Sequence, residues 1–207
     1  MLHVDDLVLF QGDSITDAGR SRSDDNQLGS GYAALVAAWY TASHPGRRVR
    51  FLNRGISGNR VQDLRARWQS DCLDLRPNVV SILIGINDTW RRYDANDPTT
   101  AAVYAEDYRA ILGAVRDLGA RLVILEPFLL PTPPDRLAWR EDLDPKIQVA
   151  RSLAREFEAL YVPLDGLFAA ASTRRAPELW ATDGVHPAPT GHALIAQAWL
   201  EAVERDA

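Results

Sequence analysis

The chain has 207 residues, of which 46% are hydrophobic and 25% are charged, as in soluble globular proteins that bury a core. At about 150 residues per domain, this length predicts a single domain over residues 1–207. A net charge of −5 without a basic tract argues against nucleic-acid binding, and the single cysteine, Cys72, excludes an intramolecular disulfide and a cysteine-rich zinc site.

The N-terminal segment Met1–Asp6 has no positive charge followed by an apolar stretch, so it does not resemble a signal peptide. No apolar run reaches the roughly 18 residues that a membrane-spanning helix needs. We therefore expect a cytoplasmic protein that does not cross a membrane.

Short apolar segments alternate with helical patterns along the chain. The apolar segments predict buried strands at residues 7–11, 49–53, 79–84, 122–125 and 160–164. Apolar residues at helical spacing predict helices at residues 31–41, 61–75, 104–118, 147–157 and 190–202. Strands that are apolar on both faces and separated by helices imply a parallel sheet covered on both sides. The predicted fold class is therefore α/β, as one three-layer domain with a five-stranded parallel sheet.

Two long stretches, residues 17–30 and 128–145, are polar or proline-rich and predict irregular loops. Loops of this length in a compact domain are often functional. Ligands of open parallel sheets bind at the carboxyl ends of the strands, so the residues that follow each strand are the candidates for chemistry.

Ser14 follows the first predicted strand, in the run Gly-Asp-Ser-Ile. A serine hydroxyl is a weak nucleophile and needs a neighbouring base. His186 is the candidate base, because it lies in an Asp-Gly-Val-His-Pro turn where Asp183 could bond its Nδ1 and leave Nε2 free. The alternatives are that Asp13 or Ser14 only caps a helix, and that His186 is only exposed beyond an Asx turn.

Acyl transfer also needs donors at the developing oxyanion. Three are available at strand ends: the backbone N–H of Ser14, the backbone N–H of Gly58 and the side-chain amide of Asn87. Gly58 could instead be an ordinary turn glycine, and Asn87 a cap. Each alternative is reasonable alone, but four segments with groups suited to catalysis are expected at one edge of the sheet. This combination favours catalysis.

These blocks, Gly12-Asp13-Ser14, Gly58, Gly85-Ile86-Asn87-Asp88 and Asp183-x-x-His186, resemble the four signature blocks of the SGNH (GDSL-type) hydrolases in the family's order. The resemblance implies a flavodoxin-like domain with sheet order 2-1-3-4-5. It also implies that Ser14 is the nucleophile, His186 the base and Asp183 its orienter, and that Ser14, Gly58 and Asn87 form the oxyanion hole. No cofactor or metal is expected.

The six tryptophans bear on the substrate. Trp39, Trp68 and Trp199 are expected in the core. Trp139 lies in the long loop after the fourth strand. Trp90 follows the Asn87 block and Trp180 precedes Asp183. We therefore name Asp13, Trp90 and Trp180 as candidate substrate-binding residues. Aromatic rings around a polar rim suit a sugar better than a fatty acyl chain, although they could also pack against a partner subunit in a homo-oligomer.

The runs Gly-Ile-Ser-Gly-Asn and Gly-Ile-Asn-Asp-x-Trp-Arg resemble the bacterial acetylxylan-esterase-like branch of the family. That resemblance implies a small-molecule ester substrate, an acetylated sugar or xylo-oligosaccharide. The alternatives are a lysophospholipase or thioesterase acting on short to medium acyl chains, and a non-catalytic carbohydrate-binding module. A nucleotide-binding domain is not supported, because the first strand is not followed by a glycine-rich phosphate loop.

Overall fold

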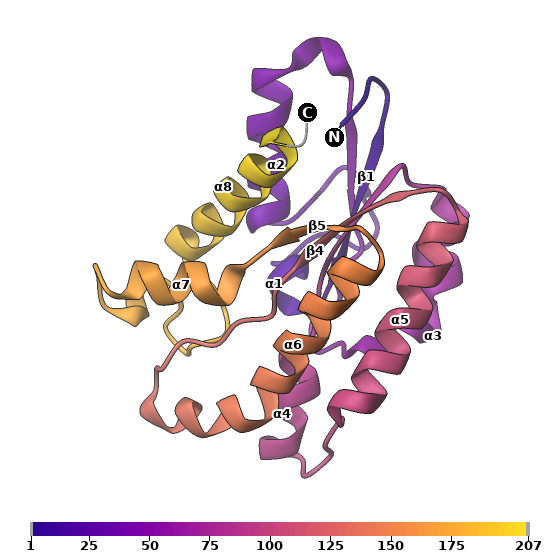
Figure 1. Ribbon diagram of the computed structural model, residues 1–207. Helices are drawn as coiled ribbons and strands as arrows, with labels where there is room; N and C mark the ends of the chain where they lie inside the picture. The colour runs from indigo at the N-terminus through magenta and orange to yellow at the C-terminus, as the bar shows by residue number, and fades with distance from the viewer. Residues whose placement is uncertain (1, 206–207) are drawn as a thin grey trace.

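The structure is a computed structural model that describes residues 2–205. Its centre is one parallel sheet of five strands in the order β2-β1-β3-β4-β5 (Figure 1), which confirms the predicted α/β class. The strands are β1 (Leu7–Gly12), β2 (Arg50–Asn53), β3 (Val79–Leu83), β4 (Arg121–Leu125) and β5 (Leu160–Val162). The predicted domain ran over residues 1–207, and residues 1, 206 and 207 lie outside the described part.

Helices cover both faces of this sheet. The α-helices are α1 (Ser14–Asp17), α2 (Tyr32–Ser43), α3 (Val61–Asp71), α4 (Ile86–Asp94), α5 (Ala101–Asp117), α6 (Arg140–Glu156), α7 (Leu164–Ser172) and α8 (Pro189–Arg205). Four short 3-10 helices complete the secondary structure of residues 2–205: η1 (Pro45–Arg47), η2 (Leu73–Leu75), η3 (Pro134–Trp139) and η4 (Pro177–Leu179).

The alternation of side chains along each strand builds a separate core on each face. Val8 and Phe10 of β1 join the core beneath α2, α7 and α8, whereas Leu9 between them joins the core beneath α3, α5 and part of α6. In Figure 1 the first group of helices lies to the left of the sheet and the second to the right. Burial on both faces explains why the strands are almost continuously apolar.

The structure differs from the predicted elements in three places. Residues 86–94 and 164–172 form α4 and α7, which were not predicted, and the predicted loop at residues 128–145 contains η3 and the start of α6. Pro145, where the predicted loop ended, sits in the second turn of α6 and removes a single intrahelical hydrogen bond there. The buried Lys146 ammonium, bonded to the Asp142 carboxylate, holds that turn together.

Two of the three tryptophans predicted to be core are confirmed. Trp68 and Trp199 are 4% and 0% exposed, but Trp39 is 65% exposed. The run Tyr32–Tyr40 is apolar at almost every position, so no polar face indicates the orientation of α2. In the structure, α2 turns Tyr32, Val36 and Tyr40 inward and leaves Trp39 outside that stripe.

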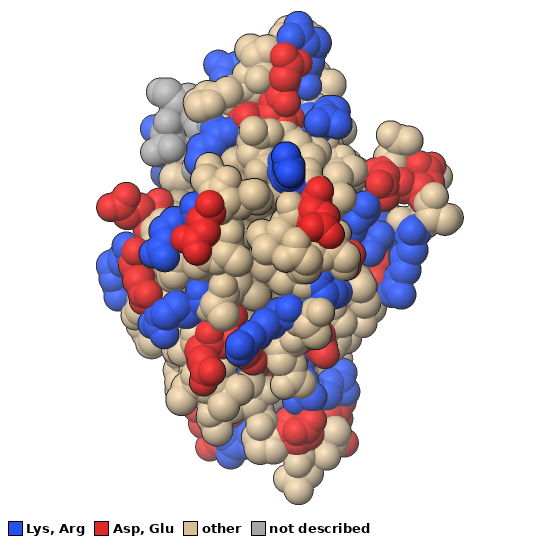
Figure 2. Space-filling model, turned by 90° about the vertical axis from the view of Figure 1, so that its right-hand side faces the viewer, with Lys and Arg blue, Asp and Glu red and all other residues tan. Residues whose placement is uncertain are grey.

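The surface carries charges of both signs. On the face that includes α5, acidic and basic side chains are interspersed over an otherwise neutral surface (Figure 2). Among residues 2–205, no helix combines the length and the apolar character required to cross a membrane.

A buried hydrogen bond joins α8 to the sheet. The Trp199 indole Nε1–H donates to the Ser81 hydroxyl at 3.0 Å, and both residues are fully buried. We predict that Ser81→Ala lowers the free energy of unfolding by about 1–3 kcal/mol, because the indole donor loses its partner away from water. Urea titration followed by tryptophan fluorescence measures this. The exposed Ser70→Ala variant should stay within about 0.5 kcal/mol of wild type, and an equally small effect of Ser81→Ala would contradict the prediction.

Candidate active site

The carboxyl edge of the sheet collects the residues that the sequence singled out. β1 ends at Gly12, and the chain turns at once into the short helix α1. Asp13 is the N-cap of α1 and accepts the Ile15 N–H at 3.0 Å, which places Ser14 at the first helical position, partly exposed. This cap brings the Ser14 hydroxyl to the surface of the edge.

His186 meets Ser14 there from the far end of the chain. Its Nε2 lies 2.9 Å from the Ser14 Oγ, and its Nδ1 lies 2.6 Å from an Asp183 carboxylate oxygen. The other carboxylate oxygen of Asp183 accepts the backbone N–H groups of Val185 and His186, at 3.0 and 2.7 Å. The carboxylate therefore fixes both the turn and the imidazole, and the Nδ1 contact directs Nε2 to accept the serine proton.

The surroundings of this pair favour a charged imidazolium. The hydrogen bond that His186 donates to the Asp183 carboxylate raises the pKa of His186 above its usual value, although partial burial opposes this. Partial burial alone would raise the pKa of Asp183, but the hydrogen bonds from His186 and Val185 outweigh it and hold that pKa well below its usual value. Asp183 therefore stays ionised while His186 exchanges a proton.

The loop after β2 lies beside Ser14 and is held from several sides. Ile56 N–H donates to the Gly12 carbonyl at 3.1 Å, and both the backbone N–H and the hydroxyl of Ser57 donate to Asp17 at 3.0 Å. Gly58 follows with a φ of +86°, a backbone region that side chains disfavour. The loop thus presents its backbone in a fixed conformation.

Asn87 joins this loop from α4. Its side-chain Nδ2 donates to the Asn59 carbonyl at 3.1 Å, which leaves the second hydrogen of the same amide to act as a donor. The structure therefore brings the sequence-predicted donors of Gly58 and Asn87 onto adjoining segments, next to the β1–α1 turn that carries Ser14.

Asp88 supports the same arrangement, a role that sequence reasoning missed. It is fully buried and accepts the Val61 N–H, the first amide of α3, at 3.2 and 3.4 Å. Burial raises the pKa of Asp88 to about 7, although the Val61 amide and the Lys146 charge oppose the shift. An acidic residue directly after the Asn87 candidate was the available signal, but nothing in the sequence indicated its partner.

Asp13 does not lie where a substrate-binding residue would. Its side chain is fully buried beneath Ser14, with one oxygen capping α1, so we correct its predicted role to one of support. Burial raises the pKa of Asp13 to about 7, although the Ile15 amide and the charge of His186 oppose this.

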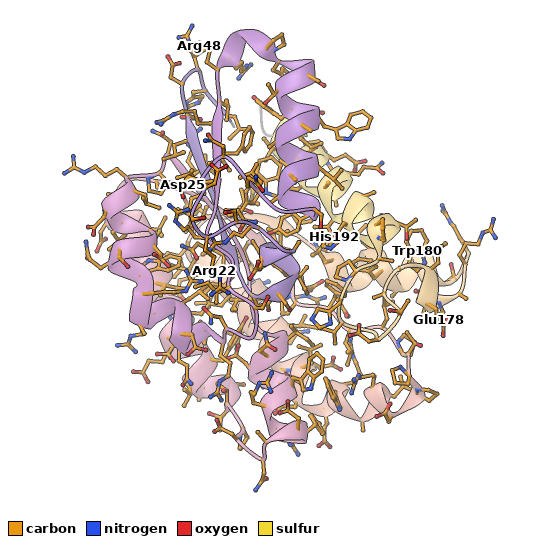
Figure 3. All side chains as sticks on the ribbon, turned by 180° about the vertical axis from the view of Figure 1, so that it is seen from behind. Arg22, Asp25, Arg48, Glu178, Trp180 and His192 are labelled. Carbon is orange, nitrogen blue, oxygen red and sulfur yellow. The ribbon has the colours of Figure 1, made fainter. Side chains whose placement is uncertain are left out.

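Of the two candidate substrate-binding tryptophans, Trp90 is the one in ring contact with His186. Its ring centroid lies 5.8 Å from that of His186 and 5.3 Å from that of Trp139. Trp139 is 5% exposed and stacks on Tyr93, so it supports Trp90 from the interior of the protein. Trp180 is partly buried and packs against the core beneath α2 and α8, next to Glu178 of η4 (Figure 3).

A second histidine, His192 on α8, lies where α2 begins (Figure 3). Its Nδ1 accepts the Tyr32 N–H at 3.1 Å, and burial lowers the pKa of His192 to about 4. His192 therefore acts as a neutral cap for α2. Within residues 2–205, no three His, Cys, Asp or Glu side chains are grouped so that they could hold a metal ion.

Comparison with known proteins identifies the family of this chain. Residues 10–194 match the GDSL-like lipase/acylhydrolase family. The chain is 36% identical over 204 residues to an acetylxylan esterase of Geobacillus stearothermophilus, across 95% of this chain and 93% of that protein. The family resemblance predicted from the four sequence blocks is confirmed.

Solved structures give the same result. A protein of Parabacteroides merdae assigned to the GDSL-like lipases has a TM-score of 0.93 at 38% identity, over 98% of this chain and 97% of that one. A variant of an acetyl-xylooligosaccharide esterase from Geobacillus stearothermophilus has a TM-score of 0.90 at 33% identity, over 98% and 95% of the two chains. Catalytic mutants of that acetylxylan esterase have an aspartate, a histidine or a serine replaced by alanine.

The pKa values of the two histidines should be shifted in opposite directions from the ordinary value. We predict that NMR titration of the imidazole signals gives a pKa for His186 above the ordinary value of about 6.5, because Asp183 stabilises the imidazolium. His192 should titrate at about 4, because burial favours its neutral form. Asp183→Asn should lower the pKa of His186 and leave that of His192 unchanged. If His186 titrated below 6.5 in the wild type, the electrostatic description of the pair would be wrong.

Proposed function

This chain belongs to the GDSL-like lipase/acylhydrolase family and is a carboxylic ester hydrolase, and we propose that it removes acetyl groups from sugars or xylo-oligosaccharides through an acyl-enzyme on Ser14. The observation that carries the proposal is the hydrogen-bonded series from Ser14 Oγ to His186 Nε2, at 2.9 Å, and from His186 Nδ1 to Asp183, at 2.6 Å. Serine, base and orienting carboxylate at these distances form a nucleophilic triad.

The steps follow from this geometry. As the Ser14 oxygen attacks the ester carbonyl, its proton moves to His186 Nε2, and Asp183 stabilises the imidazolium. The imidazolium then protonates the departing alcohol oxygen, which leaves the acyl group on Ser14. A water molecule that donates its proton to the neutral His186 attacks this acyl-enzyme in the same way, and acetate leaves as Ser14 recovers its proton.

In both halves of the reaction, negative charge collects on the former carbonyl oxygen. We assign its stabilisation to the Ser14 N–H, the Gly58 N–H and the Asn87 side-chain amide. The bonds that hold the 54–59 loop to Gly12 and Asp17, and Asn87 to Asn59, fix these donors before substrate arrives. Donors that need no rearrangement are the ones that contribute most to such a step.

The position of Trp90 supports a sugar as the alcohol part of the substrate. Because His186 protonates the leaving oxygen, the alcohol must lie next to the imidazole, and the Trp90 ring is 5.8 Å from that imidazole. An aromatic ring offers an apolar face to the C–H groups of a sugar ring. The similarity to an acetylxylan esterase over 95% of the chain favours acetyl as the acyl group.

The substrate can be tested on two series of esters. We predict that the enzyme releases acetate from acetylated xylose and xylo-oligosaccharides, and that its kcat/KM on p-nitrophenyl esters is highest for acetate and falls as the acyl chain lengthens. Ser14→Ala should hydrolyse neither series above the uncatalysed background. A preference for octanoate would contradict the acetyl assignment and favour a lysophospholipase or thioesterase activity. Substantial hydrolysis by Ser14→Ala would overturn the nucleophile.

The role of Asn87 has its own signature. Asn87→Ala should lower kcat by about 10²- to 10³-fold with little change in KM, because the lost donor acts mainly on the transition state. Steady-state kinetics on p-nitrophenyl acetate measures this, and the exposed Asn26→Ala variant serves as the matched control. If kcat of Asn87→Ala fell by less than about threefold, the side-chain amide would not belong to the oxyanion hole.

A further inference from the structure

The turn that carries the base is exposed and needs external support. The His186 and Asp183 side chains are 46% and 36% exposed. Outside contacts reach the turn from the segment after β4: Leu130 N–H donates to the Gly184 carbonyl at 2.9 Å, and Arg136 Nε–H donates to the Asp183 carbonyl at 3.3 Å. The approach is so close that a Cβ on Gly184, whose φ is +80°, would lie 2.3 Å from the Thr132 carbonyl oxygen.

Arg136 is the residue that supports this turn through its side chain, and two aromatic rings hold that side chain in place. Its guanidinium carbon lies 4.0 Å from the Trp139 ring centroid and 5.2 Å from that of Trp90. Only 16% of the Arg136 side chain is exposed. Cation–π contacts of this kind gain strength when the cation is shielded from water, so the guanidinium has a fixed place between η3 and α4.

The same two rings extend the support to the imidazole. Trp139 stacks on Tyr93, whose hydroxyl donates to the Ala138 carbonyl at 3.0 Å and so fastens η3 to α4. Trp90, which contacts Trp139, also packs against the His186 ring. Arg136 therefore contacts the main chain of the orienting residue and also the ring that lies against the base.

We propose that Arg136 is a positioning residue for His186: by joining the Asp183 main chain to the Trp90 ring, it holds the imidazole at its 2.9 Å approach to Ser14. The proposal rests on the proposed function of His186 as the base. Arginine is required because one planar group must stack on indole and donate from Nε at the same time, which the lysine ammonium does not do.

The test uses Arg136→Lys and Arg136→Met, with the exposed Arg174→Met as the matched control. We expect kcat per active site on p-nitrophenyl acetate to fall about 10- to 100-fold in both Arg136 variants, with KM within about threefold, because a misplacement of about 1 Å costs up to about 10²-fold in rate. Active sites are counted by titration with a p-nitrophenyl phosphonate. The rate constant of that inactivation should fall in parallel with kcat, since it also needs His186 against Ser14.

Three results would overturn the positioning role. The first is a kcat per active site within twofold of wild type, even if the melting temperature or the number of active sites falls, since Arg136 would then support folding alone. The second is a loss confined to acetylated sugars with normal phosphonate inactivation, which would make Arg136 a substrate contact. The third is full activity in Arg136→Lys. The failure of this inference is distinguishable from the failure of the proposed function. If the wild type is active, Ser14→Ala is inactive and the Arg136 variants have normal activity, then only this inference fails. If Ser14→Ala stays active, the proposed function fails.

Discussion

The parallel direction of the five strands is the constraint on which the site depends. Because every strand runs the same way, every strand ends at the same edge, so the segments that carry Ser14, Gly58 and Asn87 meet there. The turn that carries His186 comes just before α8 and reaches the same edge through its bond to the segment after β4. The sheet brings them to the edge, but the catalytic contacts are decided by what holds each loop after its strand ends. The 2.9 Å contact between Ser14 and His186 joins the two ends of the chain.

Each functional segment is fixed by groups that a substrate would not touch. The buried Asp13 caps the helix that begins at Ser14. Asp17 accepts a backbone N–H of the loop before Gly58, and Asp88 accepts the first backbone N–H of α3. Arg136 does the same for the turn that contains Asp183 and His186. Three of these four supports are aspartate side chains, whose oxygens accept backbone N–H groups at the start of a helix or in a loop. The groups that we propose as oxyanion donors and base are thus held in place by the protein itself.

Sequence reasoning succeeded where the signal was local or periodic. The strands and the outer helices followed from apolar runs and periodicity. The juxtaposition of Ser14 with His186 followed from the Gly-Asp-Ser-Ile run, the Asp-Gly-Val-His-Pro turn and the resemblance to the family's signature blocks. It failed where tertiary contacts decide: α6 begins before Pro145 because buried Lys146 holds its first turns, and Trp39 is exposed because an almost wholly apolar helix gives no orientation. Asp13 was expected to bind substrate, but its side chain is buried below Ser14, where it caps α1. The sequence does not indicate this burial. The pairing of Arg136 with two tryptophans has no sequence signal.

If these segments surround one reacting carbonyl carbon, a crystal structure of the phosphonylated enzyme will show it. We predict that phosphorus is bonded to Ser14 Oγ, and that the phosphoryl oxygen lies about 2.7–3.1 Å from the backbone nitrogens of Ser14 and Gly58 and from Asn87 Nδ2. Phosphorus on another residue, or a phosphoryl oxygen facing away from Gly58 and Asn87, would contradict it.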